Sequence, residues 1–172
     1  MSGSMRRCDR EPAALGSRHA GLSLDPEIEH DRAVSYYMRY FADAPLALDS
    51  IKAGLSAEDP RFKIDGGEIT RGTDLLAEIE INRPGSDLFD DELAKMSSQL
   101  QAVQSSAAGQ VLSRVRTTQA LLALQVVVQA RTQEQTMELL GPLWTVLQSL
   151  ANGLWHVDGQ GFFDGGQLVV AV

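Results

Sequence analysis

Apolar and polar side chains follow one another along this chain in two periods, one typical of strands and one typical of helices. Residues 34–41 are rich in tyrosine and phenylalanine, which favour pleated, half-buried surfaces, and they predict a first strand. In residues 43–59 apolar side chains recur at helical spacing after Pro45, so this segment predicts a helix. Residues 61–65 and 73–82 alternate apolar and polar side chains, which predicts two antiparallel strands with a turn or extra pairing between them.

The middle of the chain continues with a helix and a buried strand. Residues 86–103 keep the helical period after a break at Arg83-Pro84-Gly85, so they predict a second helix. Residues 104–109 are small and polar and predict a loop. Residues 116–129 contain an apolar run that only Gln125 interrupts, which is typical of a central strand.

The C-terminal part predicts one more helix and a closing hairpin. Thr132 and Gln135 form a capping-box signal before a stripe of apolar residues at helical spacing. Gly141-Pro142 lies inside this stripe and predicts a kink or a break. Short strands are expected at 154–157 and 167–172, with glycine-containing turns between them.

The first six predicted elements follow the ferredoxin-like split βαβ order (βαββαβ), and an additional helix and a closing β-hairpin come after them. We therefore expect an α+β fold with an antiparallel sheet and helices on one face. Residues 1–30 show no apolar periodicity and predict a flexible N-terminal arm. The expected organisation is this arm followed by a single α+β domain at 31–172.

Composition supports one globular domain and bears on where the protein works. The 172 residues are 44% hydrophobic and 22% charged, which is ordinary for a folded domain. Cys8 is the only cysteine, so an internal disulfide is excluded. The chain has no apolar run long enough to span a membrane and no apolar region after Arg6 and Arg7 that would indicate a signal peptide, so we expect a cytoplasmic protein. Arginine outnumbers lysine 12 to 3, which is typical of GC-rich bacterial genomes.

The net charge of −8 is concentrated in one part of the chain. Residues 41–92 hold 13 acidic and five basic side chains, and the charges of the remaining residues cancel. Phosphate backbones are bound by lysine and arginine, so this balance argues against nucleic acid as a partner. It also disfavours docking on anionic lipid.

Two groups of acidic residues and one histidine are candidates for chemistry. Glu78 and Glu80 share one face of a predicted strand, where two carboxylates about 6.6–6.8 Å apart could serve as acid and base or hold a hard cation. The simpler interpretation is cross-strand pairing with Arg61 and Lys63. His156 is a weak catalytic candidate, because a lone histidine among apolar neighbours is more often structural.

Asp87, Asp90 and Asp91, followed by Glu92, resemble a divalent-cation cluster and are candidate metal ligands. Acidic residues also collect at helix starts because the helix dipole favours them there, and that interpretation competes with a metal site. The glycine-rich C-terminal segment contains Trp155, Phe162 and Phe163, which could line an aromatic pocket.

Three functions remain open at this point. The leading hypothesis is a non-enzymatic binding or protein-interaction module without a cofactor, self-associating as a homodimer in which the apolar run Leu168–Val172 adds to the partner's sheet edge. The second is an acidic inhibitor or immunity-type protein that binds a basic protein partner. The third is a small metal-dependent enzyme that uses the acidic cluster.

Overall fold

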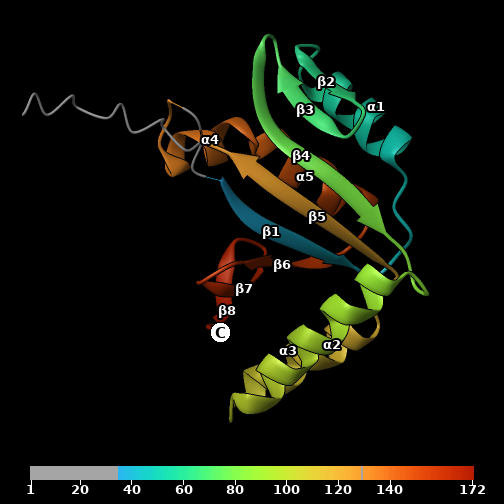
Figure 1. The fold of residues 1–172 in the computed structure, drawn as a ribbon, viewed down its shortest axis with the longest axis vertical. Coiled ribbons are helices and arrows are strands. Elements are labelled where there is room, and N and C mark those ends of the chain that lie inside the picture. Colours follow the sequence, from blue (N-terminus) through green and yellow to red (C-terminus); the bar gives the residue numbers. More distant parts are fainter. Residues whose placement is uncertain (1–34, 129) are drawn as a thin grey trace, which may run out of the picture. The chain divides into compact units, whose positions relative to one another are not determined.

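The computed structural model describes residues 35–128 and 130–172, so the arm predicted at 1–30 lies outside the described residues. Within the described ranges, eight strands form one antiparallel sheet in the order β2-β3-β4-β5-β1-β6-β7-β8 (Figure 1). The strands are β1 (Ser35–Ala42), β2 (Phe62–Asp65), β3 (Glu68–Arg71), β4 (Asp74–Asn82), β5 (Ala120–Val127), β6 (Gly153–Val157), β7 (Gly161–Asp164) and β8 (Gln167–Val170). The helices are α1 (Leu48–Glu58), α2 (Asp87–Ala102), α3 (Ser106–Arg116), α4 (Gln133–Leu139) and α5 (Gly141–Leu150).

The middle of the sheet is formed by β5 and β1. β5 pairs with β4 on one side and with β1 on the other, and β1 pairs with β6. Leu121 and Leu122 point to opposite faces of β5, and both are fully buried. The prediction of a central strand in this segment is therefore confirmed.

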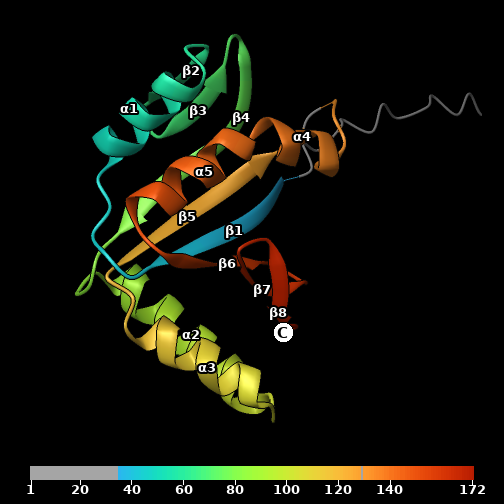
Figure 2. The same cartoon turned by 180° about the vertical axis from the view of Figure 1, so that it is seen from behind.

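Both faces of the sheet carry a hydrophobic core, and helices cover both. On one face Tyr40 and Leu122 pack with α1, α4 and α5, which lie in front of the sheet in Figure 2. On the other face Phe41 and Leu121 pack with α2 and α3. The expectation of helices on one face is wrong, because the apolar stripes of α2 and α3 cover the alternate side chains of the same strands.

The ferredoxin-like order is not confirmed, because the sheet is larger than predicted and the described residues contain extra elements. β3 lies between β2 and β4, after a turn in which Gly66 and Gly67 take positive φ values of 56° and 94°. α3 begins inside the segment predicted as a loop at 104–109, where the Ser105 hydroxyl accepts a hydrogen bond from the Ala108 amide. Val111 and Val115 continue its buried face.

Several local signals are confirmed. The Ser86 hydroxyl accepts from the Phe89 amide and caps α2. The capping box of Thr132 and Gln135 starts α4. The helical stripe divides at Gly141 into α4 and α5, as the Gly-Pro pair predicts. No helix in the described part of the chain is both long and apolar enough to cross a membrane.

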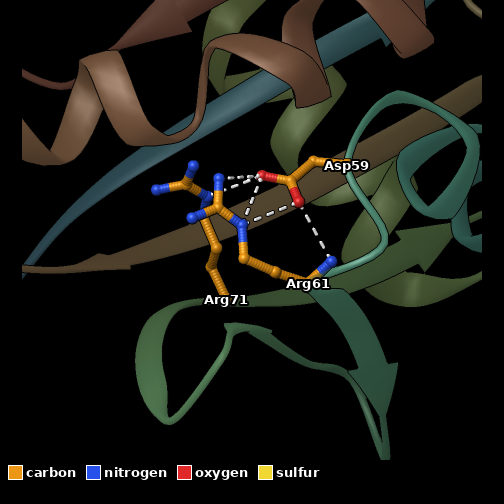
Figure 3. Close-up of polar contacts among 3 residues, drawn as sticks. All are labelled: Asp59, Arg61 and Arg71. Carbon is orange, nitrogen blue, oxygen red and sulfur yellow. Dashed lines mark hydrogen bonds and ion pairs between the residues drawn. The ribbon is translucent and has the colours of Figure 1, made fainter.

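An exposed charged cluster fixes the turn between α1 and β2. The Asp59 carboxylate accepts hydrogen bonds from the Arg61 guanidinium at 2.8 and 2.9 Å and from Arg71 Nε at 2.9 Å (Figure 3). These bonds, above all those from Arg61, hold the pKa of the Asp59 carboxyl well below its usual range. The carboxylate thereby ties the end of α1 to both β2 and β3.

Candidate functional site

Glu78 and Glu80 lie on β4, exposed on the sheet face opposite to α1 and α5. Glu78 is opposite Glu68 on β3 and Gln125 on β5. The predicted pairing of Glu78 and Glu80 with Arg61 and Lys63 is wrong, because β3 lies between β2 and β4.

The three glutamates Glu68, Glu78 and Glu80 line a polar hollow of about 460 Å³ together with Tyr37 and Gln125. Within the described residues they form no ion pair. Glu68 and Glu78 are like charges directly opposite each other, an arrangement that weakens strand pairing. A basic protein partner at this hollow stays a prediction.

The candidate metal ligands Asp87, Asp90 and Asp91 lie at the start of α2. Asp87 and Asp90 are in the first turn, behind the Ser86 cap, where the helix dipole stabilises negative charge. Among the residues that the structure describes, no group of three or more His, Cys, Asp or Glu side chains is placed to hold a metal ion. Asp87 and Asp90 are therefore placed to stabilise the start of α2, and a metal site at these aspartates stays a prediction.

His156 belongs to a partly buried cluster that we call the arginine cluster, formed by Arg39, Glu92, His156 and Asp158. Arg39 is 9% exposed on β1, and its guanidinium forms ion pairs with Glu92 (Nε to Oε2, 2.6 Å) and with Asp158. His156 is opposite Arg39 in the β1–β6 pairing, is 4% exposed and packs against the Phe162 ring. The cluster therefore joins α2, β1 and the β6–β7 turn.

The imidazole of His156 is held in its neutral form. Its Nδ1 lies 3.6 Å from Asp158 Oδ1, which is too long for a hydrogen bond. Burial first, and then the nearby Arg39 guanidinium, lower the pKa of His156 to about 4, although Asp158 and Glu92 act in the opposite direction. These contacts are those of a structural histidine, and a catalytic role for it stays a prediction.

We expect His156 to make folding sensitive to acid. The pKa of His156 in the folded protein lies below the unfolded value of about 6.5. Its contribution to the free energy of unfolding is therefore present in full above pH 6.5 and is lost as the pH drops towards 4. Between pH 7 and pH 4.5 this contributes a loss of roughly 2–3 kcal/mol. Urea unfolding at both pH values should show a smaller loss for His156→Gln, because the glutamine side chain has no group that takes up a proton in this range. Equal losses would contradict this assignment.

An apolar pocket with a volume of about 620 Å³ lies on the other face of the sheet. Its lining side chains come from β1, β6, β7, α4 and α5 and from the adjoining loops. The apolar ones are Tyr36, Met38, Met137, Trp144, Trp155, Val157 and Phe163. The prediction of an aromatic-lined pocket holds for Trp155 and Phe163, whereas Phe162 packs into the core on the opposite face.

Aromatic stacking fixes one wall of the apolar pocket. The rings of Trp144 on α5 and Trp155 on β6 meet edge to face, with centroids 4.4 Å apart. Tyr40 packs behind Trp155 at 4.7 Å, and its hydroxyl donates a hydrogen bond of 2.7 Å to the Ala151 carbonyl. The wall is therefore anchored from the core and does not depend on a bound molecule for its shape.

The rim of the apolar pocket is polar but carries little charge. Three exposed glutamines, Gln133, Gln148 and Gln160, line it with Thr132. Among its described lining residues, Glu134 is the only one with a side chain charged at neutral pH. Burial raises the pKa of Tyr36 to about 12, so its phenol stays protonated.

Comparisons of the chain with protein-family models, curated proteins and solved structures found no match. The chemistry of the pocket therefore carries the functional inference. Volumes of 300–1,000 Å³ with apolar walls and a few polar groups at the edge are typical of sites that bind small molecules. The apolar pocket has these properties and is the site to which we assign function.

Sequence reasoning missed most of this pocket because its wall is assembled from separate elements. Met137 and Trp144 belong to the stripe of apolar residues that predicted a helix, and Gln148 lies outside that stripe. The break at Gly141-Pro142 was predicted, but the helical period does not show which strands α4 and α5 cover.

Proposed function

We propose that the protein is a non-enzymatic binding module that holds an uncharged, largely apolar ligand in the apolar pocket. The observation that carries this proposal is a pocket of about 620 Å³ whose wall contains both tryptophans of the chain. Protein interiors are close-packed, so apolar space of this size is costly to maintain and is rarely left by chance. A bound apolar molecule would recover the lost packing and burial energy.

The lining favours an uncharged ligand over a fatty acid or another anion. A buried carboxylate needs a cation or several donors to offset its desolvation, and Glu134 at the rim would repel it. The amides of Gln133, Gln148 and Gln160 each offer both donors and an acceptor, which suits hydroxyl, carbonyl or amide groups.

Filling the pocket should weaken ligand binding, whereas the same change elsewhere should not. Val157 lines the pocket on β6, and Val169 lies outside it on β8. We expect the neutral apolar dye Nile red to bind the wild-type protein and to change its tryptophan emission, because Trp144 and Trp155 touch the site. Val157→Phe should weaken binding by about tenfold or more, because the ring occupies the ligand's space, and Val169→Phe should bind as the wild type does.

Val157 is buried, and overpacking at such positions costs about 1–3 kcal/mol, so folding of each variant is checked by thermal melting. Gln148→Phe, at the exposed rim on α5, is a second filling variant that leaves the core untouched, with Gln101→Phe on α2 as its control. Equal dye binding by the wild type and by folded pocket-filling variants would refute the proposal. Failure of Nile red and of a panel of uncharged aromatic compounds to bind the wild type would also refute it.

A further inference from the structure

The two outer edges of the sheet differ in charge. β2 forms one edge and carries Lys63 and Asp65 as exposed side chains, next to the exposed Arg61. Charged side chains on an edge strand discourage pairing with another chain. β8 forms the other edge, and residues 165–172 contain no charged side chain. Only the β8 edge therefore lacks this protection.

β8 also exposes apolar side chains. Leu168 is 53% exposed and Val169 is 37% exposed. Within the described residues β8 pairs only with β7, so its outer side presents backbone donors and acceptors that another strand can use. An extended strand from a second chain satisfies these groups and covers Leu168 and Val169 at the same time.

We propose that β8 is a self-association surface on which two copies of this chain pair antiparallel, so that one sheet continues through both. Pairing of β8 with its own copy is related by a two-fold axis, uses the same surface on both chains and closes at two subunits. This assembly goes beyond the binding function proposed for the pocket and does not depend on it.

The location of the acidic residues is the reason for choosing a second copy as the occupant. Two chains of net charge −8 repel each other, and the excess of acids lies in residues 41–92. That segment includes α1, β2, β3, β4 and the start of α2, and its three complete strands are separated from β8 by four strands or more. Asp164, the acid nearest to β8 in the sequence, forms an ion pair with Arg114. Pairing through β8 therefore brings together two edges without charged side chains and keeps the acidic residues of β2, β3 and β4 apart.

Replacing Leu168 with lysine on the exposed edge should weaken association. Sedimentation velocity of the full chain over a range of concentrations should show a monomer–dimer equilibrium for the wild type. Leu168→Lys should raise the dimer dissociation constant by about tenfold or more, because two like charges would meet at the pairing edge. Leu150→Lys, at an exposed leucine near the end of α5, is the matched control and should dimerise as the wild type does.

Hydrogen exchange gives a second readout that needs no variant. The amides of residues 167–170 should exchange more slowly at high protein concentration than at low concentration, whereas those of β2 should not change. A wild type that stays monomeric at all concentrations would overturn the proposal. A folded Leu168→Lys protein that dimerises as well as Leu150→Lys, or β8 amides that ignore concentration, would overturn it as well.

Discussion

Replacing Arg39 with methionine should lower the free energy of unfolding by about 2–4 kcal/mol, one of the largest effects expected of a single substitution in this protein. Arg39 is 9% exposed, and its guanidinium neutralises Glu92 and Asp158 at the same time. Methionine keeps the apolar stem but leaves Glu92, whose side chain is 21% exposed, beside only the more distant Lys95 at 3.8 Å. Urea unfolding followed by circular dichroism measures the loss.

Arg114→Met is the matched control for this substitution. Arg114 also forms an ion pair with an aspartate, Asp164, but its side chain is 42% exposed, and exposed pairs contribute about 0–1 kcal/mol. The difference between the two variants should therefore exceed about 1 kcal/mol. Similar small losses for both would mean that the arginine cluster does not hold α2 to the sheet. The double variant Arg39→Met with Glu92→Gln should lose less than the sum of the single losses, because the two residues share one interaction.

Adding a β-carbon at Gly161 should cost about 3 kcal/mol or more, because it combines backbone strain with a clash that cannot relax cheaply. Gly161 begins β7 with a φ of 124°, a conformation that residues with a side chain rarely adopt. A β-carbon there would also run into the backbone carbonyl of Val170 and the Cα of Ala171. Gly161→Ala must therefore push β8 away from β7.

Gly159→Ala separates strain from clash. Gly159 has a φ of 75°, but its added β-carbon would meet nothing within 4 Å, so only the strain of about 1–2 kcal/mol applies. Thermal unfolding of both variants, with hydrogen exchange of the β8 amides, tests the distinction. We expect faster exchange in β8 for Gly161→Ala alone, and equal melting temperatures for the two variants would contradict the clash.

Local structure was predictable wherever a few neighbouring residues determine it. Thr132 and Gln135 satisfy each other's backbone groups, so the start of α4 could be located without knowing the rest of the fold. The division at Gly141-Pro142 and the central position of β5 followed in the same way from backbone chemistry and from an apolar run.

Long-range strand pairing could not be predicted, because the sequence pattern of one strand does not identify the strand with which it pairs. The insertion of β3 between β2 and β4 removed the expected pairing of Glu78 with Lys63. α3 was missed because its first turn consists of serine, alanine and glycine, which resemble a loop, and its buried stripe is short. Arg39 is 53 residues from Glu92 and 119 residues from Asp158, so no spacing rule connects them.

The candidate site was also predictable from the sequence only in part. The aromatic residues of the C-terminal segment indicated a pocket, and Trp155 and Phe163 are part of it. The part of the lining that contains Met137 and Trp144 depends on how α4 and α5 pack on the sheet. Burial of apolar side chains is satisfied equally well by a filled core and by a lined pocket, so the sequence pattern does not distinguish the two.

The central position of β1 has a consequence for how the chain folds during synthesis. β1 is made early, but its two neighbours, β5 and β6, begin at Ala120 and Gly153. Domains rich in such distant pairings fold slowly, because a long loop must close before the pairing stabilises it. On the ribosome, the apolar side chains of Met38, Tyr40 and Phe41 stay exposed until β5 and β6 have been translated. During that interval β1 is an unpaired apolar segment that chaperones can bind. The middle of the sheet is therefore among the last parts of the sheet to form.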